Sequence, residues 1–330
     1  MRRRRGVDAD DASGRRHVGN ALVVRGVADV KRVEREAARG AGRWLLQEAD
    51  GGYSISMTSY ETGVVKKLGY TRATAAKTPL PAKWHVDSTD DPEASHSAVP
   101  HKFDDPRQVL DLLTFTAYIL RADIAFAVSA LSAAVTIWEP KHDRALGRTV
   151  RYLKGHIGAK ITWPGNFEIT LSAHVDASFA NDIFSDFSTS RARSRIAGVV
   201  FLGNAPLWFF TTRTKTVPLS TAEAELIALV RLLRGLVILR VTILMVFNLK
   251  TLPPTVVYED NMAVIQMLRK RTISGRARHV RVAIGYVINV LDAGHAIVSF
   301  VSTKGQLANG LTKAETKDEH DRTCAAFFSP

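Results

Sequence analysis

The pattern of apolar and polar residues divides the chain into parts with different expected structure. Residues 1–43 have few aromatic side chains and no sustained apolar period, which predicts a flexible arm. Residues 53–57 alternate as a strand does, and residues 59–68 have the spacing of an amphipathic helix. Residues 81–105 are rich in Pro, Ser, Asp and His and predict a linker, whereas residues 106–155 have a helical period. The core expected in this helical part comprises Val109, Leu110, Leu112, Leu113, Ile119, Leu120, Ile124, Val128, Leu131 and Leu153.

The last part of the chain mixes strands and helices. A short turn-like segment, 203–205, predicts a hairpin between two of the strands. Ser220 and Glu223 have the spacing of a capping box, in which Ser220 accepts from the backbone of Glu223 and the Glu223 side chain reaches back, so a long helix is expected to begin there. The predicted order is strands 168–176, 196–202 and 206–211, the helix from 220, strand 255–259, helices 260–269 and 278–292, and strand 296–301.

Composition and charge favour a globular protein with a polyanionic partner. The chain has 330 residues, of which 46% are hydrophobic, enough for one or two ordinary cores. Its 45 Lys and Arg exceed 32 Asp and Glu, giving a net charge of +13 that favours nucleic acid and leaves an anionic membrane surface open. Residues 1–43 supply +6 of this charge. The pattern gives no indication of an oligomeric state.

Two features bear on the compartment. The single cysteine, Cys324, excludes an intrachain disulfide and a cysteine-based zinc site, so a reducing compartment, cytoplasmic or nuclear, is expected. No apolar segment of useful length follows the basic residues at the start of the chain, so a secretory signal is not expected. The most apolar run, 235–249, is 15 residues long and contains Arg240, which is too short and too charged for a membrane span.

Three acidic residues lie at chemically useful positions in the predicted order. Asp176 closes the first strand, Glu225 lies in the first turns of the long helix, and Asp260 follows the fourth strand. Carboxylates that converge from two strand ends and a facing helix can hold two divalent cations for displacement at phosphorus, and oxygen-only ligands suit magnesium. Taken singly, each is more often a solvated surface acid.

Short motifs around these acids resemble a known family. They read Asp176-Ala-Ser-Phe-Ala-Asn-Asp182, Leu219-Ser-Thr-Ala-Glu-Ala-Glu225-Leu-Ile-Ala-Leu229 and Val257-Tyr-Glu-Asp260-Asn261, and they resemble the RNase H domain of copia-type retrotransposons. The segments 65–70, 77–80, 121–131 and 150–155 resemble the end of the reverse transcriptase and the connection after it in the same Pol polyprotein. Residues 306–313 resemble the closing motif of the family. The resemblance thus covers roughly residues 44–315, and its specificity comes from the whole series in order.

The resemblance implies a domain order and a fold class. We expect a basic flexible arm at 1–43, a mostly helical reverse-transcriptase thumb or connection remnant at 44–160, an RNase H-like domain at 161–315 and a tail at 316–330. The fold class implied is α/β, an RNase H-like mixed five-stranded sheet with flanking helices. The catalytic aspartates of the polymerase have no match in this chain, so DNA synthesis is not expected.

The resemblance also implies an activity and its site. The RNase H site of the family uses four acids, which fall on Asp176, Glu225, Asp260 and a fourth position occupied by Asn309. It implies a two-metal magnesium site and an endoribonuclease that cleaves RNA in RNA/DNA hybrids. Glu223 and Glu225 compete for the second position, and Glu225 is preferred because the family pattern matches it and capping gives Glu223 a structural role. Asn309 offers a carbonyl oxygen without charge, so cleavage is expected to be impaired.

Two alternatives to an active nuclease stay open. The first is a non-catalytic nucleic-acid-binding remnant, which would keep the fold and the basic surface. The second is an unstable product of a decaying element, indicated by the departures from the family motifs at Ser178 and across 278–285. A cooperative unfolding transition would count against the second.

A basic stretch is the expected nucleic-acid contact. Residues 269–281 contain six basic side chains and no acid, which would grip a phosphate backbone without reading its sequence; a solvated helix face is the alternative. These residues are Arg269, Lys270, Arg271, Arg276, Arg278 and Arg281. The aromatic run at 208–210 is more typical of a core strand than of base stacking, and His174 is expected to pack or face solvent rather than bind metal.

Overall fold

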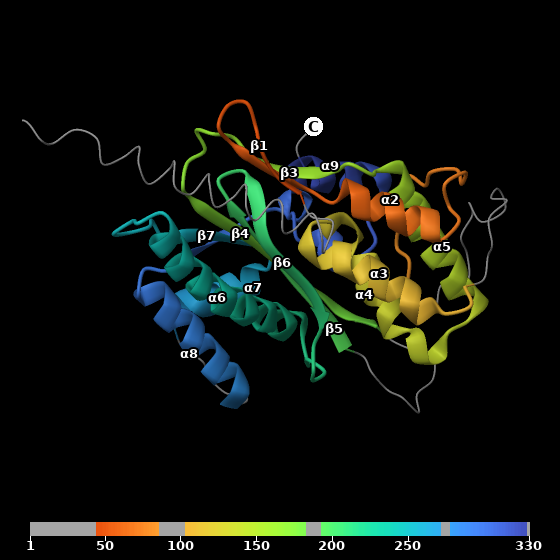
Figure 1. The fold of residues 1–330 in the computed structure, drawn as a ribbon. Helices are drawn as coiled ribbons and strands as arrows, with labels where there is room; N and C mark the ends of the chain where they lie inside the picture. The colour runs from red at the N-terminus through yellow and green to blue at the C-terminus, as the bar shows by residue number, and fades with distance from the viewer. Residues whose placement is uncertain (1–43, 86–102, 183–192, 272–277, 329–330) are drawn as a thin grey trace, which may run out of the picture.

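The computed structural model describes residues 44–85, 103–182, 193–271 and 278–328 (Figure 1). The predicted arm, 1–43, and most of the predicted linker, 86–102, therefore lie outside the described residues.

A five-stranded mixed sheet forms the centre of the molecule, in the order β6-β5-β4-β7-β8. The first three strands are antiparallel, while β7 runs parallel to both β4 and β8. The strands are β4 Leu171–Asp182, β5 Arg193–Leu202, β6 Ala205–Arg213, β7 Thr255–Glu259 and β8 Ala296–Phe300. The predicted strands are all present, although β4 begins later than expected and runs beyond Asp176, with an irregularity between Ser178 and Asp182.

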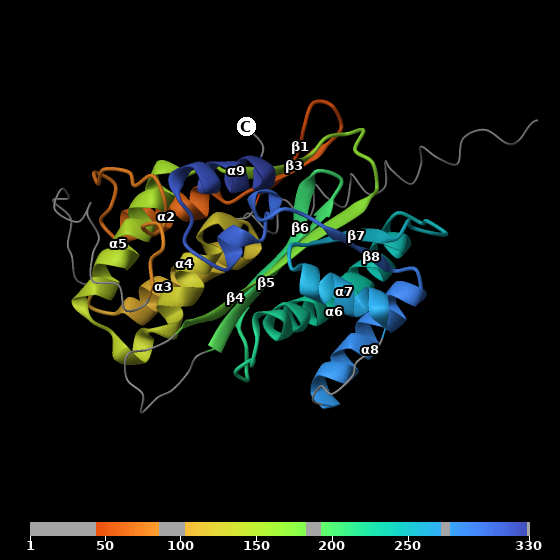
Figure 2. The ribbon, with the colours of Figure 1, turned by 180° about the vertical axis from the view of Figure 1, so that it is seen from behind.

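Three helices cover one face of this sheet: α6 Thr221–Val246, α7 Met262–Lys270 and α8 Arg278–Asp292 (Figures 1 and 2). Ser220 caps α6 as predicted by accepting from the Glu223 amide. The Glu223 carboxylate reaches back one residue further than a capping box requires and accepts from the Leu219 amide. The core beneath these helices joins Val175 and Val257 of the sheet to Leu229 and other apolar residues of α6.

The helices α2–α5 and the C-terminal helix cover the opposite face. They are α2 Thr58–Lys67, α3 Pro106–Ile119, α4 Ala122–Ala133 and α5 Pro140–Gly155. Their core includes Ala197, Val199 and Phe201 of β5. Both faces of β5 are thus buried, which explains why its sequence is a continuous apolar run rather than an alternating one. The predicted core residues of 106–155 are buried except Leu112 and Ile119, which are half-buried.

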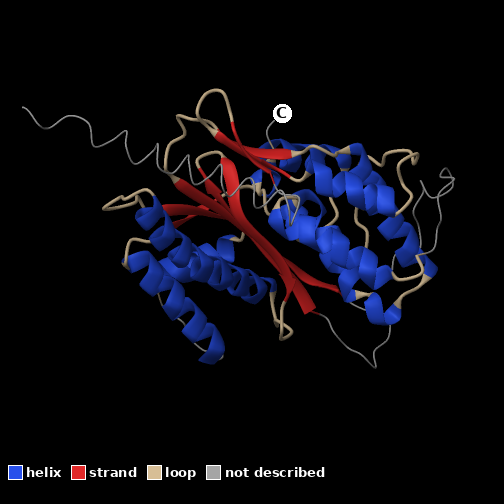
Figure 3. Ribbon diagram, in the orientation of Figure 1, coloured by secondary structure: helices blue, strands red, loops and turns tan. Residues whose placement is uncertain are grey.

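A second, antiparallel sheet contains β1 Trp44–Gln47, β2 Tyr53–Ser56 and β3 Lys160–Trp163 (Figure 3). The strand β3 pairs with β2, over a hundred residues earlier in the chain. β3 therefore spans the domain boundary predicted between residues 160 and 161.

The segment predicted as a tail, 316–330, contains a helix, α9 Lys317–Phe327. Phe327 is buried in the core shared by α4 and β5, and the buried His320 lies 2.9 Å from the Tyr152 hydroxyl of α5. Only a few of the residues of α9 are apolar, so its burial depends on tertiary contacts that a local pattern does not reveal. Within the described residues, no helix is long and apolar enough to cross a membrane.

Candidate metal centre

The three predicted acids meet at one end of the central sheet. Asp176 lies in β4, Glu225 in the second turn of α6 and Asp260 directly after β7, and one carboxylate oxygen from each lies within 4.8 Å of the others. They converge because β4 and β7 are parallel neighbours, while α6 crosses the sheet with its N-terminal end over the same edge. The convergence expected from the sequence is therefore observed.

Burial makes negative charge costly at this site. Asp176 is 5% exposed and Glu225 is 3% exposed, whereas Asp260 is half-buried. Burial raises the pKa of Asp176, and the neighbouring Asp260 adds to this, against the effects of Lys313 and Thr312. Burial, followed by the charges of Asp176 and nearby acids, raises the pKa of Glu225 to about 11. The site therefore favours bound protons or cations.

Two threonines hold the aspartates in place. The Thr303 hydroxyl donates to Oδ2 of Asp260 at 3.0 Å, and the Thr312 hydroxyl donates to Oδ2 of Asp176. The Thr312 oxygen also lies 3.0 Å from the main-chain oxygen of Asn309. The segment after β8 thus contacts both strand-borne acids.

Asn309 lies in this segment and is buried. Its Nδ2 donates to the main-chain oxygen of Thr303 at 2.8 Å. Its Oδ1 is buried and has no hydrogen-bond partner among the described residues. The Asn309 amide oxygen is therefore open to a hydrogen-bond donor or a cation, should either lie within reach.

The residues present fit a divalent cation. All the donor atoms are oxygens, as magnesium requires, and Glu225 Oε2 is a second buried oxygen that lacks a partner in the described part of the chain. Within those residues, none of the three carboxylates forms an ion pair. Buried carboxylates without cationic partners need a counter-charge, which one or two cations would provide.

His174 packs in the structure. Its Nδ1 lies 3.0 Å from Oε1 of Gln306, and its ring stacks against Tyr258 with centroids 4.7 Å apart. The Gln306 amide donates to the main-chain oxygens of Val175 and Tyr258, at 2.8 and 3.3 Å. Gln306 therefore ties β4 to β7 immediately before the two acids. Burial lowers the pKa of His174 to about 4, against the effect of the hydrogen bond to Gln306.

The sequence reasoning missed a fourth carboxylate, Glu259. It is the last residue of β7 and is fully buried, with one oxygen accepting from the Asn261 amide at 3.0 Å. Burial raises the pKa of Glu259 to about 8. The alternation of β7 would have located it, since Thr255, Val257 and Glu259 share a face.

The basic stretch is only partly described. Arg269, Lys270 and Arg281 are exposed. Arg271 is also exposed, but its guanidinium binds the Asp292 carboxylate at 2.5 and 2.9 Å, a pairing across 21 residues that the local absence of acids did not predict. Arg276 and the side chain of Arg278 lie outside the described residues.

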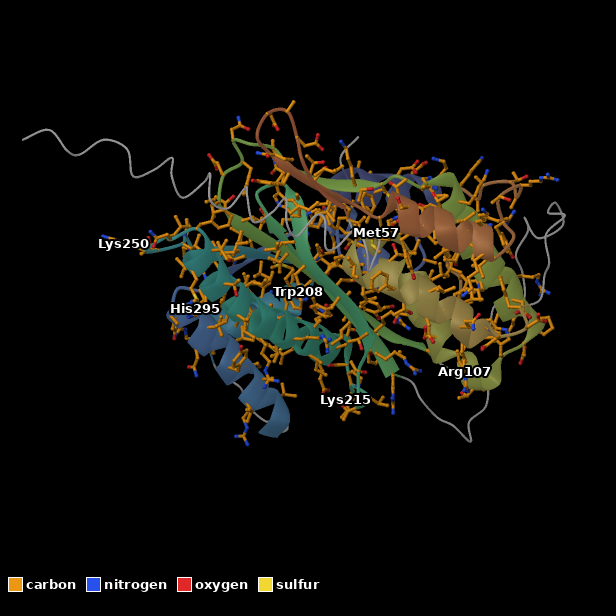
Figure 4. All side chains as sticks on the ribbon, viewed as in Figure 1. Met57, Arg107, Trp208, Lys215, Lys250 and His295 are labelled. Carbon is orange, nitrogen blue, oxygen red and sulfur yellow. The ribbon has the colours of Figure 1, made fainter. Side chains whose placement is uncertain are left out.

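The aromatic run of β6 belongs to the core, as predicted. Phe209 and Phe210 are buried, and the partly buried Trp208 lies between the sheet and α6 (Figure 4). A Cβ added at Gly235 of α6 would stand 2.3 Å from the Trp208 ring, so this glycine lets the helix approach the indole. Stacking of these rings on bases is therefore not expected.

Similar sequences are found in retrotransposon polyproteins. The chain is 28% identical over 215 residues to the retrovirus-related Pol polyprotein from transposon RE1 of Arabidopsis thaliana, covering 64% of this chain and 14% of that protein. It is 26% identical over 265 residues to the RE2 polyprotein of the same plant, covering 79% of this chain and 17% of that protein. It is 25% identical over 272 residues to the TNT 1-94 polyprotein of Nicotiana tabacum, covering 81% and 19%. The chain thus spans less than a fifth of the length of these curated relatives, and no family model matches it.

Solved structures that match part of the chain include RNases H. The N-terminal RNase H domain of rv2228c from Mycobacterium tuberculosis is 12% identical, with a TM-score of 0.32, and the match covers 48% of this chain and 99% of that one. LC11-RNase H1 in complex with RNA/DNA hybrid is 10% identical with a TM-score of 0.32, and the match covers 46% of this chain and 98% of that one.

The fold class itself follows from the strand order. Three antiparallel strands, a long helix, and two parallel strands added at the other edge form an RNase H-like domain, as the sequence predicted. The chain is similar to Pol polyproteins of copia-type transposons, and this similarity supports a retrotransposon-derived RNase H-like domain.

Proposed function

We propose that the RNase H-like domain binds RNA/DNA hybrids and cleaves their RNA strand, using a two-cation magnesium site that is weakened at position 309. The observation that carries this proposal is the convergence of Asp176, Glu225 and Asp260 within 4.8 Å. Three buried or half-buried carboxylates from separate elements, without ion-pair partners in the described residues, are costly to the fold unless they hold cations.

Asp176, Glu225 and Asp260 would hold the cations, with the Asn309 Oδ1 as a neutral ligand. When bound, the cations would activate the attacking water and stabilise the leaving oxygen of the scissile phosphate. Thr312 and Thr303 keep the two aspartates aimed at the site through their hydroxyl hydrogen bonds. Lys313 acts on Asp176 electrostatically and would also attract the substrate phosphate.

The exposed basic residues would hold the nucleic acid beside these acids. α7 begins two residues after Asp260 and has 9 residues, so Arg269 and Lys270 at its far end lie about 13 Å along the helix from the site. Side chains at this distance would contact phosphates flanking the scissile one. Such contacts give salt-dependent affinity without base readout.

The amide at position 309 favours a second candidate function, a nucleic-acid-binding remnant without cleavage. Asn309 brings no charge, so two cations with a total charge of +4 would meet −3 from the three acids. The second cation would then be poorly held, and turnover would fall further than hybrid binding.

A cleavage and binding assay separates the two candidates. A labelled RNA/DNA hybrid, the matching DNA duplex and the single-stranded RNA would each be incubated with the protein, with and without magnesium. We expect slow, magnesium-dependent cleavage of the hybrid alone, lost in Asp260→Asn while hybrid binding persists. Hybrid binding without cleavage, both by the unchanged chain and by Asn309→Asp, would favour the non-catalytic remnant.

A further inference from the structure

Glu259 is a buried acid that the proposed mechanism does not use. It is 0% exposed at the end of β7, next in the chain to Asp260. One carboxylate oxygen accepts from the Asn261 amide, while the other is buried and has no hydrogen-bond partner among the described residues. A buried carboxylate with an open oxygen costs several kcal/mol relative to an apolar residue, roughly, unless a counter-charge reaches it.

Glu259 lies on the helix-covered face of the sheet. In β7 it shares a face with Val257, which packs in the core beneath α6, the helix that carries Glu225. The register of β4 and β7 pairs His174 with Tyr258, and continuing it sets Glu259 beside Val175 and Asp260 beside Asp176. Glu259 therefore lies behind the acid cluster, one strand position before it.

The electrostatic links agree with this placement. The charge of Glu259 contributes to the raised pKa of Glu225, and the charges of Asp260 and Asp176 contribute to that of Glu259. No described Lys, Arg or His forms an ion pair with Glu259. The charges of the four carboxylates thus influence one another, and Lys313 opposes them at Asp176.

We propose that Glu259 supplies the fourth negative charge of the cation site, in place of the acid that position 309 lacks. This inference rests on the proposed cation site. Two divalent cations carry +4 and the three converging acids carry −3. Glu259 offsets part of the remaining charge from behind the cluster, less than a coordinating carboxylate at position 309 would, because its oxygens are not among the converging atoms. Glu259 is therefore a positioning residue rather than a ligand. It stabilises bound cations through charge and not through coordination.

The test is a cation titration that does not require cleavage. Magnesium and calcium binding would be measured by calorimetry and by the rise in Tm, for the unchanged chain, Glu259→Gln, Asn309→Asp and the double variant. Gln keeps the oxygen that accepts from Asn261 and removes only the charge. We expect Glu259→Gln to weaken cation binding about ten- to a hundredfold, as loss of residues behind metal ligands does. Without cations its Tm should be unchanged or higher, because Gln removes the cost of burying an ionisable acid.

Relocating the charge gives the decisive comparison. Asn309→Asp should restore binding in the Glu259→Gln background and should raise affinity more there than in the unchanged chain. Glu315→Gln is the matched control, since Glu315 is also buried with an unpartnered oxygen but faces His320 at 3.7 Å, and it should leave cation affinity unchanged.

The outcomes distinguish this inference from the proposed function. A chain that binds neither cation would refute the cation site and Glu259's role together. Normal cation binding by Glu259→Gln would refute only the role of Glu259, as would a double variant that Asn309→Asp does not rescue. Should Glu259→Gln lack a cooperative unfolding transition, Glu259→Met tests the same loss of charge in a side chain of similar length.

Discussion

Acidification should destabilise the protein through His174. This ring is buried between Gln306 and Tyr258, and burial lowers its pKa from 6.5 to about 4. The unfolded chain therefore takes up the proton first as pH falls, so the stability from the neutral ring is complete above pH 6.5 and is lost toward pH 4. The difference between the two pKa values contributes about 3 kcal/mol to the free energy of unfolding. About 2 kcal/mol of this contribution is lost between pH 7.5 and pH 5.

The assay is urea unfolding of the unchanged chain and His174→Asn at both pH values. The buried acids Asp176 and Glu225, whose pKa values are raised, act in the opposite direction as pH falls, so the difference between the two proteins is the informative quantity. The free energy of unfolding of the unchanged chain minus that of His174→Asn should be about 2 kcal/mol smaller at pH 5 than at pH 7.5. His295→Asn, at the edge of the molecule (Figure 4), should keep the pH dependence of the unchanged chain. An identical pH dependence in the unchanged chain and His174→Asn would refute the reasoning.

Three further perturbations test the interface and the packing. Arg269→Ala with Lys270→Ala should weaken hybrid binding and lower the slope of log affinity against log salt concentration by roughly one for each lost phosphate contact. Lys66→Ala with Lys67→Ala, on α2, should change neither. An unchanged slope would assign Arg269 and Lys270 to a solvated face. Gly235→Ala should lower the free energy of unfolding by about 1–3 kcal/mol, because its Cβ would overlap the Trp208 ring. Gly285→Ala, with open space around it, should be neutral or slightly stabilising. Equal Tm values for these two variants would contradict this prediction. Arg121→Met should cost about 3–5 kcal/mol in urea unfolding because it leaves Glu61 and Asp123 buried without their cation, and a loss below about 1 kcal/mol would show that neighbouring groups compensate.

The sequence was sufficient for most elements and for the meeting of the acids. Alternation located the strands to within a few residues, and Ser220 marked the start of α6 because its side chain caps the helix. The start of α6 also distinguishes the two glutamates. Glu223 accepts from the Leu219 amide at the N-terminus of the helix, whereas Glu225 lies beside Asp176 and Asp260. Asn261 likewise caps α7, so that helix begins after Asp260 rather than at it.

What the sequence did not predict depends on contacts between distant residues. β3 belongs to the N-terminal sheet only because it pairs with β2. One face of α9 is buried because it packs against α4 and β6. Arg271, directly after α7, pairs with Asp292 at the end of α8, which no local count of charges reveals. Glu259 was not singled out in the sequence, because burial of its carboxylate follows from the packing of β7 into the core beneath the helices, a tertiary feature.

We propose that Asp176, Glu225 and Asp260 form a cation-dependent nuclease site that the amide at position 309 weakens. Single-turnover cleavage of a labelled RNA/DNA hybrid across a magnesium titration tests this most directly, with the unchanged chain, Asn309→Asp and Asp260→Asn compared. We predict slow cleavage by the unchanged chain, faster cleavage at lower magnesium by Asn309→Asp, no cleavage by Asp260→Asn, and similar hybrid binding by all three. Rapid cleavage by the unchanged chain that Asn309→Asp leaves unaltered would contradict the account.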